Sequence, residues 1–145
     1  MTLLFADDAA LDALGERFLA RSLPKPEWTH AAHLAVAAWL LLRRPEIDAA
    51  REMPGLIRAY NEATGVPNSD TRGYHETLTL AWLRGVGAFL EAMPPGLAAH
   101  AAVNALLASP LAEKRSPLAY WSEGLLFSPA ARRGWVVPDL APLPF

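Results

Sequence analysis

The sequence predicts an all-α fold, a single-domain bundle of about five to seven helices with an extended proline-rich tail. Hydrophobic residues recur every three or four positions along several segments, which is the spacing of one face of a helix. The 13 prolines and 9 glycines mostly stand between those segments, where they end helices. Hydrophobic residues make up 52% of the 145 residues, which is enough for one core, so we expect one domain over residues 1–145.

The first two helices are predicted over residues 7–22 and 30–43. Leucine and phenylalanine recur at helical spacing in the first, and the two prolines of the LPKP segment prevent its continuation. Thr29 is a suitable N-cap for the second. Because residues 30–43 are apolar nearly all round, we expect this helix at the centre of the bundle.

A third helix is predicted over residues 45–64, with Gly65 as its C-cap. Pro54 and the glycine after it should kink this helix or start a new turn. The segment GVPNSDTR that follows is rich in turn-forming residues, and we expect it to be a loop.

A fourth helix is predicted over residues 72–92, capped by Asp70 or Thr71 and ended by two prolines. An alanine-rich helix should follow over residues 96–108, and a single turn over residues 110–114.

The last part of the chain should hold two short helices and then the tail. Serine precedes proline at 116–117 and at 128–129, and a proline is tolerated best at the first position of a helix. Three prolines follow within the last eight residues. We expect the tail, about 134–145, to lie extended over the bundle with Trp135 and Phe145 as anchors.

The charge balance and composition exclude several classes of function. The net charge is −2 and the isoelectric point about 6.1, so no overall positive field favours nucleic acid or anionic lipid. The apolar runs are shorter than the roughly 20 residues that span a bilayer. The chain has no cysteine, and its acidic start does not resemble a signal peptide. We therefore expect a cytoplasmic protein without nucleic-acid or membrane partners; a homodimer stays open.

Three of the four histidines lie at the predicted beginnings of two helices. His30 and His33, in WTHAAHL, are three residues apart, which places them on one helix face. His75 follows in GYHET, with Glu76 beside it. If the two helix beginnings meet, the three imidazoles could bind zinc, nickel or iron. Glu76 or Glu27 would then act as ligand or base.

Two alternatives to a metal site remain open. In a metal-free enzyme, Glu76 or a histidine such as His75 would act as general base in hydrolytic or proton-transfer chemistry. Tyr60, Asn61 and Arg72 would bind a small polar ligand at the rim of the same pocket. In the other alternative the histidines are structural, and the protein is a non-catalytic interaction or scaffold domain. The sequence does not decide whether the protein is an enzyme.

Three segments together resemble a known family: WTHAAHLAVAAWLL, YNEATGVPNSDTRGYHETLTLAWL and YWSEGLLFSPAARRGWVVPDLAPLP. The family consists of small bacterial helical proteins that share WTHxxHL, GYHET and PDLxPLP segments and has no assigned activity. The resemblance implies one intact domain and a grouping of His30, His33, His75 and Glu76. It implies no particular reaction.

Overall fold

The computed structural model describes residues 3–145, and within that range all regular structure is helical, as the sequence predicts. The α-helices are α1 (Asp8–Leu19), α2 (His30–Arg43), α3 (Ala49–Ala63), α4 (Glu76–Glu91), α5 (Ala99–Leu107), α6 (Glu123–Leu126) and α7 (Pro129–Arg133). Short 3-10 helices occupy Lys25–Glu27, Pro110–Ala112 and Ser116–Ala119.

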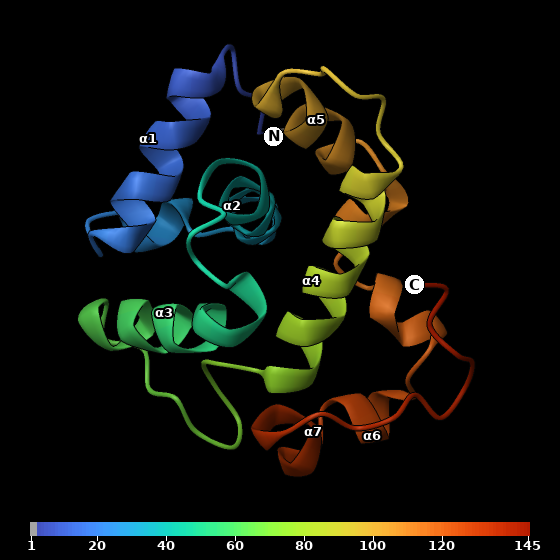
Figure 1. Cartoon of the computed structure of the whole chain (residues 1–145). Coiled ribbons are helices and arrows are strands. Elements are labelled where there is room, and N and C mark those ends of the chain that lie inside the picture. The colour runs from blue at the N-terminus through green and yellow to red at the C-terminus, as the bar shows by residue number, and fades with distance from the viewer. Residues whose placement is uncertain (1–2) are drawn as a thin grey trace.

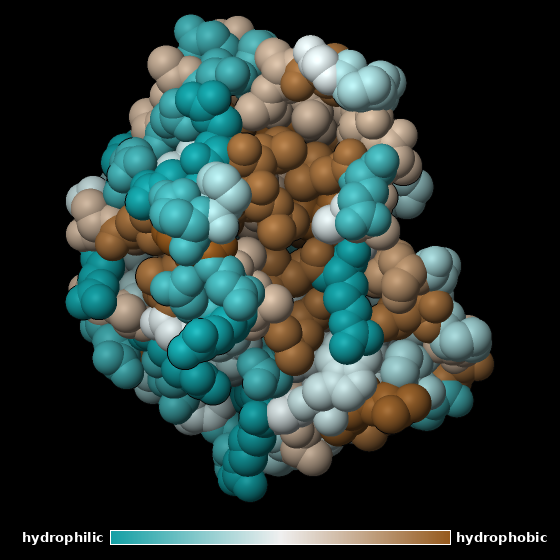
Figure 2. All heavy atoms as spheres, viewed as in Figure 1, coloured by the Kyte–Doolittle hydropathy of each residue, from teal (hydrophilic) through white to brown (hydrophobic). Residues whose placement is uncertain are grey.

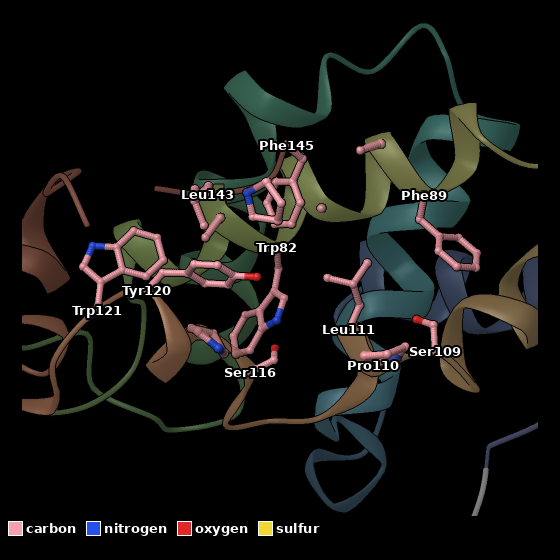
Figure 3. A pocket seen from close by; sticks show the side chains of 15 residues that line it. Trp82, Phe89, Ser109, Pro110, Leu111, Ser116, Tyr120, Trp121, Leu143 and Phe145 are labelled. Carbon is pink, nitrogen blue, oxygen red and sulfur yellow. The ribbon is translucent and has the colours of Figure 1, made fainter. Parts of the chain in front are cut away.

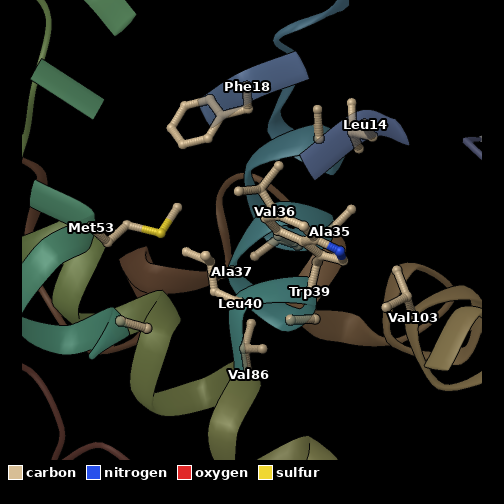
Figure 4. Close-up of a cluster of buried hydrophobic side chains, with 14 of the residues drawn as sticks. Leu14, Phe18, Ala35, Val36, Ala37, Trp39, Leu40, Met53, Val86 and Val103 are labelled. Atoms are coloured by element: carbon tan, nitrogen blue, oxygen red, sulfur yellow. The ribbon is translucent and has the colours of Figure 1, made fainter. Parts of the chain in front are cut away.

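Helix α2 is the central element of the bundle. Figure 1 views it end-on, with α1, α3, α4 and α5 arranged around it. All residues from Leu34 to Leu40 are buried, because neighbours cover every side of the helix. Figure 4 shows the side chains that these neighbours contribute, including Phe18 from α1, Met53 from α3 and Val86 from α4. The nearly all-round apolar character of residues 30–43 thus correctly predicts the central helix.

Helix α1 approaches α2 closely because a glycine faces a tryptophan. A Cβ atom added to Gly15 would lie 2.2 Å from the ring of Trp39, so no larger residue fits at this crossing. The indole nitrogen of Trp39 donates to Asp12 at 2.9 Å, which fixes the ring in place.

Helices α3 and α4 begin later than the sequence predicts. Helix α3 begins at Ala49, where the Asp48 side chain accepts from the backbone nitrogen of Arg51. It continues through Pro54 without a break. A proline within a helix removes the hydrogen bond to the carbonyl four residues earlier and crowds that carbonyl; here that residue, Ala50, is exposed, so its carbonyl can bond to solvent.

Helix α4 begins at Glu76 instead of residue 72, and its N-cap is His75 instead of Asp70 or Thr71. The backbone of Gly73 has a φ of +83°, which is a left-handed conformation that a helix cannot include. A Cβ atom at this position would lie 2.3 Å from the carbonyl oxygen of Pro67. The loop therefore remains irregular through residue 75.

The end of the chain packs on the far side of α4 from α2. Ser128 caps α7 as predicted, whereas α6, capped by Ser122, has no counterpart in the prediction. A second, smaller cluster of buried residues forms here around Trp121. The ring of Trp135 meets Trp121 edge-on at 5.6 Å, and residues 134–145 contain no helix.

The face seen in Figure 2 has hydrophobic side chains gathered in the hollow between α2 and α4. Leu41 and Leu42, near the end of α2, are 40% and 39% exposed. Within residues 3–145, none of the helices combines the length and the hydropathy needed to cross a membrane.

Candidate functional site

The beginnings of α2 and α4 meet at a cavity of about 610 Å³, which we call the cationic cavity. Its other walls come from α3, the segment before α2, the loop before α4, and residues 114, 127 and 132. The cavity is lined by His30, His33 and His75 together. Two histidine-bearing segments that lie more than 40 residues apart in the sequence are therefore neighbours in space.

His33 presents one free ring nitrogen. Its Nδ1 lies 2.7 Å from the carbonyl oxygen of Thr29; because a carbonyl can only accept, Nδ1 carries the proton and Nε2 does not. The ring stacks on Trp28 with 3.8 Å between centroids. Burial lowers the pKa of His33 to about 4, so the imidazole is neutral at pH 7.

His30 lies one turn earlier on the same helix face and packs against α4. Its ring is 4.6 Å from that of Trp82, centroid to centroid. Burial, with a further contribution from the nearby charge of Lys114, lowers its pKa. Its Nε2 atom is buried and has no hydrogen-bond partner within residues 3–145.

His75 has no free ring nitrogen. Its Nδ1 accepts from the backbone nitrogen of Leu78 at 3.2 Å, and its Nε2 donates to the carbonyl oxygen of Leu126 at 2.7 Å. The side chain is 7% exposed, and burial lowers its pKa. His75 thus holds the start of α4 against α6.

These hydrogen bonds weigh against His75 as a ligand of the predicted metal centre, which stays a prediction. A neutral imidazole must offer an unprotonated nitrogen to a metal, and that of His75 is engaged by a backbone amide. Across residues 3–145 there is no group of three or more His, Cys, Asp or Glu side chains placed to hold a metal ion. The same engagement leaves His75 without a nitrogen for the role of general base.

The other predicted site residues divide into two groups. Asn61 and Arg72 line the cavity. Glu76 and Tyr60 are not among its lining residues. Glu76 accepts from the hydroxyl of Tyr74 at 2.5 Å, and the buried hydroxyl of Tyr60 donates to the carbonyl oxygen of Leu23 at 2.8 Å.

All charged side chains that line the cavity are cationic. They are Lys25, Arg72, Lys114 and Arg132, and the lining includes no Asp or Glu. The three histidines are neutral at pH 7 because burial lowers their pKa values, so they do not offset this charge. The cavity is therefore positive although the whole chain has a net charge of −2.

The cavity also gathers the buried polar atoms that lack partners. Within residues 3–145, four buried side-chain nitrogen atoms have no hydrogen-bond partner: Trp28 Nε1, His30 Nε2, Trp82 Nε1 and Arg132 Nε. Each belongs to a residue that lines the cationic cavity. Indole and guanidinium nitrogens can only donate, so most of this set needs an acceptor.

The loop at the mouth of the cavity is held by hydrogen bonds on both sides. The Asn68 Oδ1 atom accepts from the side chain of Asn61 and from the backbone nitrogen of Tyr74, both at 3.0 Å. From the other side, Arg132 donates to the carbonyl oxygen of Gly73 at 3.1 Å, and Arg133 pairs with Asp70.

The sequence patterns do not predict Lys25, Lys114, Arg132, Trp28 and Trp82 as site residues. Lys114 and Arg132 lie in short segments after α5 and α6, and local patterns do not show where such segments fold back. The sequence spacing of Trp28 and Trp82 does not indicate that both residues line one cavity.

Comparison with known protein families, with curated proteins and with solved structures found no match. The proposals below therefore depend on the geometry of this chain alone.

Proposed function

We propose that this protein binds a small organic anion in the cationic cavity. The charged group would lie near Arg72, Lys114 and Arg132, and an apolar body would pack among the side chains deeper in the cavity. The observation that supports this most directly is that every charged side chain lining the cavity is cationic.

The charge distribution favours an anion over a cation. Four positive side chains on one concave, partly apolar surface attract negative charge, and low-dielectric walls strengthen that attraction. Burial lowers the pKa of the Arg132 guanidinium, which is the effect expected for a cation that has lost solvation without gaining a full counter-charge. A bound carboxylate or phosphate would supply that counter-charge.

The unpartnered atoms favour an acceptor-rich ligand. Trp28 Nε1, Trp82 Nε1 and Arg132 Nε each need an acceptor, and His30 Nε2 can donate when it carries the ring proton. Leaving a buried donor unpaired costs about 1–3 kcal/mol. Oxygens of a carboxylate or phosphate accept several hydrogen bonds at once, so an anionic group that reached these donors would supply the acceptors they lack.

The apolar walls favour a ligand with a hydrocarbon or aromatic body. Leu34, Met53, Ile57, Leu78 and Phe127 line the remainder of the cavity. A volume of about 610 Å³ lies in the range of small-molecule sites. A simple inorganic ion would leave most of this apolar surface uncovered.

The competing proposal is a divalent zinc, nickel or iron ion at His30 and His33. Within residues 3–145, His30 and His33 are the only lining histidines with a free ring nitrogen. A divalent cation would enter beside four positive side chains. Repulsion from these charges disfavours the metal. The same experiment can separate the two proposals.

The test uses benzoate as the anionic probe and benzamide as its uncharged counterpart. Calorimetric titration at low salt should detect benzoate binding and much weaker benzamide binding. Arg72 and Lys114 are exposed and make no side-chain hydrogen bond within residues 3–145. Their joint replacement by alanine should weaken benzoate about 5- to 30-fold, from roughly 0.5–1 kcal/mol per charge.

The matched control is Arg51→Ala, which removes the same charge from an exposed position outside the cavity. It should change benzoate affinity by less than about twofold. Equal affinity for benzoate and benzamide would refute the proposal. So would zinc binding that is lost in His30→Ala while benzoate has no effect on the protein.

A further inference from the structure

A second cavity, of about 420 Å³, lies beside the first and shares the side chain of Trp82 with it. We call it the aromatic cavity. Figure 3 shows the rings of Trp82, Tyr120 and Phe145 turned toward one another across it, with Leu111 and Phe89 at one side. It opens between α4, the segment after α5 and residues 143–145.

The aromatic cavity differs from the cationic cavity in charge. None of its lining residues is Asp, Glu, Lys, Arg or His. Bringing a charged group into such a site without a partner costs several kcal/mol. The lining therefore selects against ions and in favour of uncharged molecules.

The cavity owes its shape to a missing side chain. A Cβ atom at Gly85 would lie 2.9 Å from Leu111 Cδ2 and 3.0 Å from Phe145 Cζ. Since Gly85 is buried within α4, its small size lets the Phe145 ring lie against the helix and form one wall.

Two hydroxyl groups in the lining have no hydrogen-bond partner within residues 3–145. The Tyr120 hydroxyl points toward Trp82 in Figure 3, and no hydrogen bond engages it or the Ser116 hydroxyl. The third lining hydroxyl, Ser109, donates to the carbonyl oxygen of Leu106 at 2.6 Å. Tyr120 and Ser116 are therefore free to bind a polar group on a ligand.

We propose that the aromatic cavity is a second ligand site, which binds an uncharged aromatic molecule carrying a hydroxyl or carbonyl group. The ring of the ligand lies among Trp82, Tyr120 and Phe145, where edge-to-face and offset contacts are favourable. Its polar group bonds to the hydroxyl of Tyr120. This proposal does not rest on the anion proposed for the cationic cavity.

The test uses 1-naphthol, naphthalene and naphthalene-1-sulfonate as probes, with binding followed by calorimetry and by the indole NMR signal of Trp82. Naphthol should bind more tightly than the sulfonate. Tyr120→Phe keeps the ring and removes the hydroxyl. It should weaken naphthol about 2- to 10-fold, the value of one hydrogen bond, and leave naphthalene unchanged.

A second variant fills the space. Ala88 lines the cavity, and Ala88→Phe should weaken naphthol and naphthalene by at least about tenfold. Ala130→Phe, at an exposed position on α7, is the control for adding the same ring elsewhere and should have no effect on either probe. If Ala88→Phe does not fold, the comparison of naphthol and naphthalene affinity between Tyr120→Phe and the wild type still tests the proposal.

Three results would overturn the proposal: sulfonate binding as tight as naphthol binding, naphthol affinity unchanged in Tyr120→Phe, or naphthol affinity unchanged in a folded Ala88→Phe protein. Joint replacement of Arg72 and Lys114 by alanine should leave naphthol affinity within about twofold. Failure of the anion site and failure of the aromatic site are thereby distinguishable.

Discussion

Acidification should destabilise the protein through His33. This ring is covered by Trp28 on one side, at 3.8 Å between centroids, and its Nδ1–H is committed to Thr29. Burial lowers its pKa from the ordinary 6.5 to about 4. The folded protein therefore keeps the ring neutral at pH values where the unfolded chain takes up a proton.

The sign and size of the effect follow from this difference in proton uptake. The stabilising contribution of neutral His33 is complete above pH 6.5 and is lost as the pH falls from 6.5 to about 4. Each pH unit in that interval removes about 1.4 kcal/mol, or about 2 kcal/mol by pH 5. Because the ring is partly exposed to the cavity, we expect about 1–2 kcal/mol after screening by solvent.

The assay compares the wild type with His33→Gln by urea unfolding at pH 7 and at pH 5. The wild type should lose about 1–2 kcal/mol more stability than the variant over this interval. The comparison cancels the carboxylates and other histidines that titrate in both proteins. Parallel stability curves, or a histidine NMR signal for residue 33 that titrates near pH 6.5, would refute the reasoning.

Two further predictions concern stability. Gly15→Ala places a methyl group within 2.2 Å of the buried Trp39 ring and should lower the free energy of unfolding by about 1–3 kcal/mol, measured by thermal unfolding. Gly87 is a helical glycine with no heavy atom within 4 Å of the added group, so Gly87→Ala should instead stabilise the protein by about 0.5–1 kcal/mol. Equal effects of the two substitutions would contradict the packing argument. Asn104 accepts from the backbone nitrogen of Phe5 at 3.0 Å and donates to its carbonyl oxygen at 2.9 Å. Asn104→Ala should cost about 1–3 kcal/mol and accelerate amide exchange at Phe5, and unchanged exchange would show that other contacts hold this segment.

The sequence predicts the helices well where the local signals are strong. Helix α2 has the predicted bounds because Thr29 caps it and its apolar character is continuous. For α4, the sequence predicts a start four residues too early. The cap is His75, and histidine is not among the residues that usually cap helices. Gly73 has a left-handed backbone and lies so close to the carbonyl oxygen of Pro67 that a side chain does not fit, and no local pattern reveals this approach.

The candidate site is predictable only in part, because local sequence patterns do not show which distant segments meet there. The spacing of His30 and His33 identifies one wall of the cavity. The position of the ring proton on His75 is set by the carbonyl oxygen of Leu126. Lys114 and Arg132 contribute two of the positive charges that line the cavity. Those residues come from the last third of the chain, and only the tertiary fold brings them to the wall that carries the histidines.

A single indole ring, that of Trp82, forms a partition common to both cavities. A ligand in one cavity that turned the Trp82 ring would change the volume of the other cavity. By thermodynamic linkage, each ligand would then change the affinity of the other cavity for its own ligand by the same factor. Binding at the two cavities would then be coupled through the Trp82 side chain, without movement of any helix.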